Sequence, residues 1–186
     1  RSYSAAASKK GLKILTCADA TLPPLLSGDA GRIGQIINNL LSNAIKFTDS
    51  GRVVLRLKVT DIEPDHVSLQ WQVSDTGVGI SEQQLAQLFK PFSQVGGSER
   101  AGGAGLGLSI CARLSEMMGA NLRVVSEPGL GSSFSLHMRL PTIAGALAYS
   151  ADIDLTNVNI QVSAPLKDIG QSLVEWMSGW GAQAQL

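Results

Sequence analysis

Apolar residues recur at helical spacing between Asp29 and Phe47. At about 100° per residue, they fall on one side of a helix: Ile33, Ile36, Ile37, Leu40, Leu41, Ala44 and Ile45. Asp29 has the side chain of an N-cap, and Gly51 lies beyond the last apolar position. The spacing therefore predicts an amphipathic helix over 29–47.

Two later segments alternate between apolar and polar residues instead. The apolar positions are Val53, Leu55, Leu57 and Val59 in 52–60, and Val67, Leu69, Trp71 and Val73 in 66–74. A period of two predicts strands, and the polar, proline-containing loop 61–65 predicts that they form a hairpin. Because each strand keeps one polar face, we expect the sheet to be covered on one side only.

The remaining patterns complete a two-layer α/β sandwich. They predict a strand over 12–18, a short helix from Ser81, where Gln84 completes a capping box, and a third helix that ends near Gly119. A last hairpin is expected over 121–126 and 132–140, with Phe134, Leu136, Met138 and Leu140 facing inward. The expected fold is a mixed, mostly antiparallel sheet with three helices on one face.

Breaks in this pattern divide the chain into four parts. Residues 1–10 are small and polar, and are predicted to be a linker or the end of an upstream helix. The main domain is expected to span 11–141 and to close at Pro141, followed by a linker over 142–156. Residues 157–186 have a β-α-β pattern of their own, with a strand near 157–163 and a helix within 165–180.

The composition of the chain mainly excludes certain classes of protein. The chain has 186 residues, with 15 Lys and Arg against 15 Asp and Glu, so no net charge attracts nucleic acid or an anionic membrane. No apolar run approaches the ~18 residues of a membrane span, and the first residues do not resemble a signal peptide. Cys17 and Cys111 are far apart and form no metal-binding pair. These features are typical of a cytoplasmic domain.

A polar stripe lies beside the apolar face of the predicted helix. With Gln35 at 0°, Asn39 falls at about 40°, Asn43 at about 80° and Lys46 at about 20°. A solvated helix face is the ordinary explanation of such a stripe. However, Asn is a poor helix former, and amide oxygens beside a cation suit Mg²⁺ with phosphates. Both interpretations remain open at this point.

Two glycine clusters flank the short helix. Asp75-Thr76-Gly77-Val78-Gly79-Ile80 follows a strand, so Asp75 is either a turn residue or an acceptor for the amine of adenine, with glycines that let the ring approach. The stretch 102–107 opens a helix and is either a flexible loop or a phosphate cradle of backbone N–H groups. Phe89 and Phe92 are either core residues or anchors of a lid over 93–104.

Taken together, these motifs resemble the catalytic, ATP-binding domain of sensor histidine kinases, in the GHKL (Bergerat-fold) ATPase superfamily. QIINNLLSNAIKFT is similar to the N box, DTGVGI to the G1 box, FKPF to the F box, GGAGLGLSI to the G2 box and GLGSSF to the last glycine box. The resemblance covers about residues 10–141 and implies that ATP and Mg²⁺ are the ligands.

The resemblance also implies individual roles. Asn43 would hold Mg²⁺ with Asn39 beside it, Lys46 and Arg100 would meet the phosphates, and Asp75 would bind adenine. The remaining nucleotide contacts would be Gly77, Gly79, Ile80, Phe92, Gly103, Gly105, Leu106, Gly107 and Leu108. Ala104 stands where the family commonly has Thr, and the lid is about two residues shorter than its common form.

The reaction that this implies is transfer of the γ-phosphate to a histidine. Hydrolysing relatives have a Glu base at the position of Asn39, whose amide accepts no proton near neutral pH. His66 and His137 are expected to be surface residues, so the acceptor would lie on a separate dimerisation domain of a homodimeric, membrane-anchored parent, with this fragment a monomer. A hydrolysing GHKL ATPase and a degenerate nucleotide-binding scaffold are the alternatives.

The last segment resembles the start of a receiver domain, as in a hybrid sensor kinase. A receiver needs acidic residues after its first strand, and Ser163-Ala164 stands there instead. The segment is therefore expected to be a truncated, receiver-like module unable to accept phosphate. An ordinary C-terminal extension is the alternative.

Overall fold

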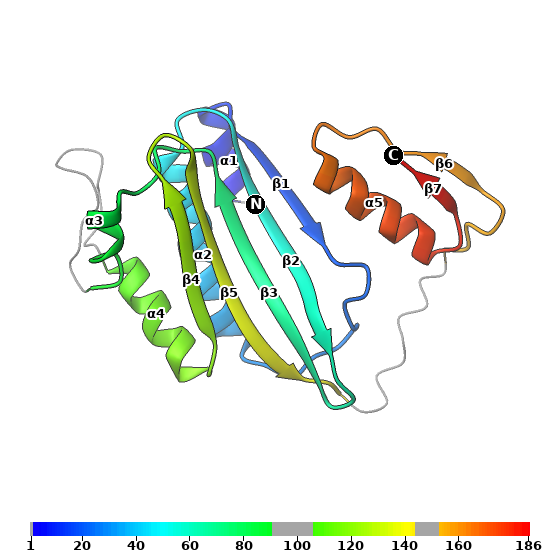
Figure 1. Cartoon of the computed structure of the whole chain (residues 1–186), viewed down its shortest axis with the longest axis horizontal. Helices are drawn as coiled ribbons and strands as arrows, with labels where there is room; N and C mark the ends of the chain where they lie inside the picture. The colour runs from blue at the N-terminus through cyan, green and yellow to red at the C-terminus, as the bar shows by residue number, and fades with distance from the viewer. Residues whose placement is uncertain (1, 91–105, 144–152) are drawn as a thin grey trace. The chain divides into compact units, whose positions relative to one another are not determined.

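The computed structural model describes residues 2–90, 106–143 and 153–186. Its first sheet contains β1 (Lys13–Ala18), β2 (Arg52–Ile62), β3 (His66–Asp75), β4 (Asn121–Glu127) and β5 (Gly131–Pro141), in the spatial order β1-β2-β3-β5-β4. β4 and β5 are antiparallel, with Val124 opposite Phe134. The five strands and the helices on one face confirm the predicted sandwich (Figure 1).

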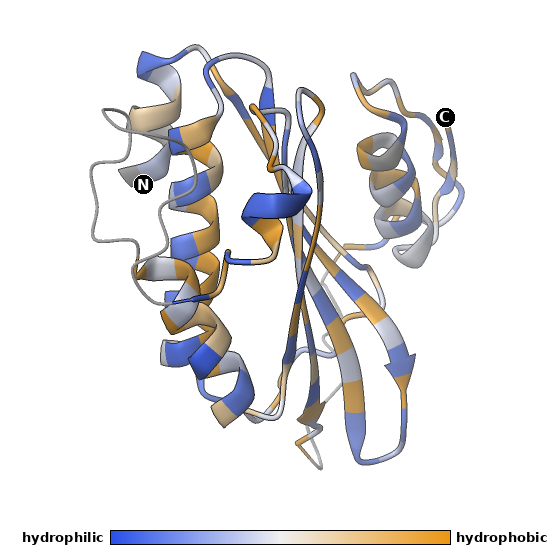
Figure 2. Cartoon of the chain, turned by 60° about the vertical axis from the view of Figure 1, so that its left-hand side comes forward, coloured by the Kyte–Doolittle hydropathy of each residue, from blue (hydrophilic) through white to orange (hydrophobic). Residues whose placement is uncertain are grey.

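Four helices accompany these strands. They are α1 (Ser2–Lys9), α2 (Ala30–Phe47), α3 (Glu82–Leu85) and α4 (Gly107–Met117). The start of the chain, predicted to be a linker or a helix end, is thus the helix α1. Both α1 and α4 pack against α2, and α4 also packs against β4. In Figure 2 the apolar side of α2 faces the sheet.

The core lies between α2 and the sheet. The six buried apolar residues of α2 are Ile36, Ile37, Leu40, Leu41, Ala44 and Ile45. They are joined by Val53, Leu57, Val67, Leu69 and Val73 from the first hairpin, and by Phe134, Leu136 and Met138 from the second. Leu140, which was predicted to face inward with these residues, is only half-buried. The apolar residues that repeat every 3.6 positions in α2 and every second position in four strands therefore form one apolar layer.

The opposite face of the sheet is less solvated than expected. Gln70 donates from Nε2 to Ser135 Oγ at 3.2 Å, and Gln72 donates to Ser133 Oγ at 2.9 Å. These cross-strand pairs leave both glutamines half-buried, and Val54 is buried. Polar pairing between neighbouring strands explains why polar residues there are not fully exposed.

The C-terminal segment forms β6 (Asn159–Gln161), α5 (Lys167–Gly179) and β7 (Gln183–Gln185). β6 and β7 are parallel, so the predicted β-α-β order is present. Contacts within the chain define two compact units, Arg1–Thr16 with Asp29–Arg56 and Gln70–Arg139, and Cys17–Gly28 with Leu57–Leu69 and Leu140–Leu186. None of the helices in the described ranges is long and apolar enough to span a bilayer.

Backbone contacts continue one residue past Pro141, where the main domain is predicted to end. Thr142 donates its N–H to the Asp65 carbonyl at 2.9 Å, and it pairs with Leu26 as an isolated bridge. Both partners of Thr142 lie in earlier parts of the chain, and the domain boundary near Pro141 stays a prediction.

Candidate nucleotide-binding site

The predicted polar stripe is present on α2. Asn39, Asn43 and Lys46 are all half-buried, on a helix whose other side forms the core. The Lys46 ammonium lies 5.1 Å from the centre of the Phe47 ring. Asp29 begins the helix by accepting a hydrogen bond from the Arg32 N–H at 2.9 Å, which is the ordinary N-cap arrangement.

Asn39 lies where α2 approaches the start of α4. A Cβ built on Gly107 would lie 3.8 Å from Asn39 Oδ1. The Cys111 thiol, one turn further along α4, is fully buried and donates to the Ile36 carbonyl at 3.9 Å. Burial raises the pKa of Cys111 to about 11, although a hydrogen bond with the Asn39 side chain lowers it in part. The structure therefore brings Gly107, the last glycine of the second cluster, close to the stripe on α2.

Asp75 ends β3 with its carboxylate half-buried. Its Oδ1 accepts hydrogen bonds from the N–H groups of Gly77 at 2.8 Å and Ser132 at 3.2 Å. Within the described residues no donor bonds to Oδ2. Burial raises the pKa of Asp75 above its ordinary value, and the two backbone hydrogen bonds lower it in part. The carboxylate is thus held in place through one oxygen, while its second oxygen keeps its accepting capacity.

The loop after Asp75 touches two other backbones closely. A Cβ on Gly77 would lie 2.5 Å from the Phe47 carbonyl oxygen, and a Cβ on Gly79 would overlap the Glu127 carbonyl. Gly79 also has φ +70°, which disfavours any side chain. These two positions require glycine, so the spacing of DTGVGI follows from close packing of this loop.

The hairpin between β4 and β5 supports the same loop. Ser126 Oγ accepts from the Ile80 N–H at 2.8 Å, and the Val78 carbonyl accepts from the Gly129 N–H at 2.8 Å. The sequence predicted only a hairpin over 121–126 and 132–140 and a resemblance of GLGSSF to a glycine box, and it did not single out Ser126 or Ser132. The available signal was Gly131, where a Cβ would overlap the Asp75 carbonyl.

The end of α2 is joined to the loop 75–80. The Phe47 carbonyl accepts a hydrogen bond from the Val78 N–H at 3.4 Å. The helix that carries the polar stripe and the loop that follows Asp75 are therefore connected through their backbones.

The remaining predicted residues divide into two groups. Ile80, Leu106 and Leu108 are half-buried, and Leu106 precedes α4 without a side-chain cap. Phe92, Arg100, Gly103 and Gly105, together with the predicted lid, lie outside the described residues.

The two histidines were expected to be surface residues, and both are half-buried. His66 Nδ1 lies 3.0 Å from Asp65 Oδ2, at the turn between β2 and β3. His137 is half-buried and lies opposite Asn121 in the second hairpin. Neither lies on a helix.

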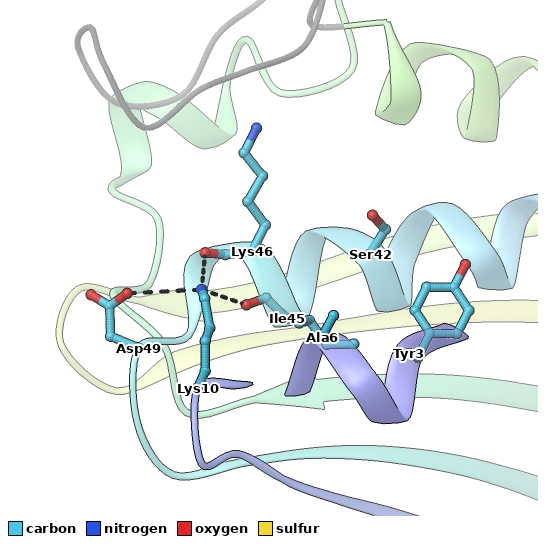
Figure 3. Close-up of a pocket in the computed structure, with 7 residues that line it drawn as sticks. All are labelled: Tyr3, Ala6, Lys10, Ser42, Ile45, Lys46 and Asp49. Atoms are coloured by element: carbon cyan, nitrogen blue, oxygen red, sulfur yellow. Dashed lines mark hydrogen bonds and ion pairs between the residues drawn. The ribbon is translucent and has the colours of Figure 1, made fainter. Parts of the chain in front are cut away.

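A groove of about 630 Å³ lies beside the stripe rather than over Asp75. Its lining residues, shown in Figure 3, are Tyr3, Ala6, Lys10, Ser42, Ile45, Lys46 and Asp49. It is formed by α1 and the end of α2, and it shares only Lys46 with the predicted nucleotide contacts. In the described ranges no three His, Cys, Asp or Glu side chains gather as a metal site.

Comparison with protein families gives one match over residues 28–142, described as histidine kinase-, DNA gyrase B- and HSP90-like ATPase. The match contains every described residue of the proposed site, from Asn39 to Leu108. It therefore covers the elements that carry both glycine clusters and the polar stripe.

Among curated proteins, the chain is 44% identical over 129 residues to hybrid signal transduction histidine kinase B of Dictyostelium discoideum, covering 68% of this chain and 7% of that protein. It is 46% identical over 147 residues to the virulence sensor protein BvgS of Bordetella bronchiseptica, covering 77% and 12%. It is 43% identical over 134 residues to the sensor histidine kinase RcsC of Escherichia coli, covering 71% and 14%. The chain thus spans a small part of each relative.

Among solved structures, full-length ShkA in complex with AMPPNP is similar, with a TM-score of 0.74 and 31% identity over 97% of this chain and 36% of that one. The mycobacterial sensor histidine kinase MprB is similar with a TM-score of 0.57 and 26% identity, over 76% of this chain and 93% of that one.

Proposed function

Because the chain belongs to the histidine kinase-, DNA gyrase B- and HSP90-like ATPase family, we propose that it binds Mg²⁺-ATP and supplies the γ-phosphoryl group to a histidine of a separate dimerisation domain. The nucleotide would lie between α2, the start of α4 and the loop 75–80. A receiver domain or response regulator would then take the phosphoryl group onward.

The observation that carries this proposal is the state of Asp75. Its Oδ1 is fixed by two backbone N–H groups, and no described donor occupies Oδ2. A half-buried carboxylate with one spare accepting oxygen suits the exocyclic amine of adenine. Close backbone contacts require glycine at positions 77 and 79, so packing within the chain holds the loop in this conformation without a ligand.

The residues on α2 fit the triphosphate and its metal. Asn43 would offer its amide oxygen to Mg²⁺, which commonly takes few protein ligands when phosphates supply the rest. Bound Mg²⁺ supplies positive charge that offsets the charge of the phosphates. Lys46, one turn further along α2, would place its ammonium at the phosphates, together with Arg100.

The side chain at position 39 favours phosphotransfer over hydrolysis. The Asn39 amide cannot act as a general base near neutral pH, so water is poorly activated. A neutral imidazole nitrogen needs no such base to attack. The γ P–O bond breaks as the P–N bond forms, and ADP leaves with the bonding electrons.

A calorimetric titration with Mg²⁺-ADP tests the proposal directly. Replacing Asp75 with Asn removes the carboxylate and should weaken binding by about 1.5–3 kcal/mol, or roughly 10–150-fold. Asp61→Asn is the matched control, because Asp61 is exposed on β2 and should not change the affinity. Equal affinities of Asp75→Asn and the unchanged chain would remove Asp75 from the adenine site.

A second titration separates metal binding from nucleotide binding. Asn43→Ala should weaken binding in Mg²⁺ and change it little in EDTA. An equal loss under both conditions would show that Asn43 supports the fold rather than the metal.

The acceptor histidine is tested with labelled ATP. The chain alone should retain no acid-labile phosphate, and adding the parent's dimerisation domain should restore transfer. Label on His66 or His137 would contradict the proposal.

A further inference from the structure

The first helix of the chain packs along the helix of the polar stripe. Ala7 of α1 is 2% exposed, and the Tyr3 hydroxyl donates to the Asn38 carbonyl of α2 at 3.3 Å. α1 therefore packs against α2, with a polar contact from Tyr3, and Figure 3 shows the two helices side by side.

The end of α1 is shaped so that Lys10 has a defined position. The Leu12 N–H donates to the Ala7 carbonyl at 2.9 Å, and the Gly11 N–H donates to the Ser8 carbonyl at 3.0 Å. With Gly11 at φ +67°, these bonds form a Schellman motif. Leu12 and Ala7 are both buried, as that motif favours. Lys10 is the residue directly before this turn.

The Lys10 ammonium binds the carboxyl end of α2. It donates to the carbonyls of Ile45 at 2.8 Å and Lys46 at 2.8 Å (Figure 3). It also donates to the Thr48 carbonyl at 3.1 Å. It also lies 3.9 Å from Asp49 Oδ1. A helix end presents carbonyls without helical partners and a partial negative charge, so a cation is well matched to this position.

The other carbonyls of the same helix end are also bonded. Ala44 O accepts from Thr48 Oγ1 at 2.6 Å, and Phe47 O accepts from the Val78 N–H at 3.4 Å. Each of the five carbonyls from 44 to 48 accepts a hydrogen bond, from Thr48 Oγ1, from the Lys10 ammonium or from the N–H of Val78 in the loop 75–80. Lys10 and Val78 hold neighbouring carbonyls of one turn, and that turn carries Lys46.

We propose that Lys10 is a positioning residue for nucleotide binding, which links α1 to the Mg²⁺-nucleotide site through the last turn of α2. The inference rests on the proposed function. Without the Lys10 ammonium, three carbonyls lose their donor, the last turn of α2 loosens, and Lys46 and the loop at Val78 lose their shared support. Movement of α1 would therefore change nucleotide affinity without any contact between α1 and the nucleotide.

The test compares variants of the full 186-residue chain in calorimetric titrations with Mg²⁺-ADP. Lys10→Met keeps the aliphatic stem but removes the donor, and it should weaken binding by about 2- to 30-fold, the range found for residues that couple to a site without touching its ligand. Lys10→Arg keeps the charge and donors and should recover most of the affinity. Lys9→Met is the matched control, because Lys9 is the exposed neighbouring residue, and it should bind as the unchanged chain does.

Amide hydrogen exchange without nucleotide gives a second readout. Lys10→Met should speed exchange at residues 44–48 and at Val78, and Lys9→Met should not. If Lys10→Met fails to fold, Lys10→Gln, which keeps one donor group, takes its place in both measurements.

The outcomes separate the inference from the proposed function. An unchanged chain that binds no nucleotide overturns the proposed function and the inference with it. An unchanged chain that binds, together with a Lys10→Met variant of equal affinity, overturns the inference alone, even if exchange at 44–48 is faster. Lys10→Arg binding as weakly as Lys10→Met would also overturn it.

Discussion

The helices α2 and α5 have similar apolar stripes but are held very differently. α2 has six buried apolar residues, an N-cap from Asp29 and a donor for its last carbonyls from Lys10. α5 follows Leu166 without a side-chain cap, and Leu173 on its apolar side is 40% exposed. Among the residues of α5 whose burial the structure describes, only Gly170 is buried.

The partners of α5 are mostly close in sequence. It packs against β7, and Trp176 and Trp180 have ring centres 5.7 Å apart. Two longer-range bonds reach the Ala18 carbonyl, from Ser172 Oγ at 3.2 Å and from Trp176 Nε1 at 2.8 Å. An apolar stripe thus predicts that a segment is helical, but its capping and burial by distant residues decide how firmly the helix is held.

The largest contrast should come from truncating one leucine in each helix. Leu40→Ala in α2 removes a side chain that is 1% exposed and should cost about 2–5 kcal/mol of unfolding free energy. Leu173→Ala in α5 should cost less than about 1 kcal/mol. Urea denaturation followed by circular dichroism measures both, and equal losses would break the comparison.

A glycine in each region should differ by a smaller amount. Gly79→Ala places a Cβ against the Glu127 carbonyl at φ +70° and should cost about 2–4 kcal/mol. Gly170→Ala meets mainly the flexible end of Leu186 and gains helix propensity, so its net effect should stay within about 1 kcal/mol. Comparable losses in urea denaturation would show that the loop at Gly79 yields more easily than its contacts indicate.

Two carboxylates should give opposite pH dependence. Burial raises the pKa of Asp75 in the folded chain, so the folded state binds its proton more readily, and this contribution to stability falls as pH rises from the unfolded pKa to the raised one. Hydrogen bonds from Thr156 lower the pKa of Asp154, so its contribution is present above the unfolded pKa and is lost as pH falls through the lowered one.

Unfolding of Asp75→Asn and Asp154→Asn from about pH 3 to 7 checks these signs. Each substitution should remove its own part of the pH dependence. The same sign of change in both variants would contradict the assigned causes.

The smallest effect is expected from removing the C-terminal segment. A chain that ends at Ile143 keeps the Thr142 bonds to Asp65 and Leu26. Because the proposed site lies within 39–108, Mg²⁺-ADP affinity should stay within about twofold. A tenfold loss would show that the segment supports nucleotide binding and that the boundary is misplaced.

The sequence predicted the main elements because their periodicity is strong. α2, both hairpins and the β-α-β order of the last segment follow the predicted patterns. Strand ends differ by up to two residues, since pairing continues through polar positions: Thr60 Oγ1 donates to the Ser68 carbonyl, and Glu63 N–H to the His66 carbonyl. The alternation of apolar and polar residues does not report such polar hydrogen bonds, so it cannot locate the end of a strand.

The relative positions of the candidate site residues were predicted best where these residues lie on one element. Asn39, Asn43 and Lys46 lie on one helix, so their angular positions around the helix axis place them on the same side. Ser126 and Ser132 support the loop after Asp75 from a hairpin about 50 residues away, and Lys10 reaches α2 from the preceding helix. Such supports depend on tertiary contacts, which no local pattern reports.

The buried thiol of Cys111 provides a built-in chemical reporter. Burial raises the pKa of Cys111 to about 11, so the thiol is protonated near pH 7 and reacts slowly. Alkylating reagents should therefore modify the half-buried Cys17 first and reach Cys111 only when α4 separates from α2. The rate of Cys111 alkylation, measured by mass spectrometry, would report how often α4 separates from α2. Bound nucleotide should slow this rate.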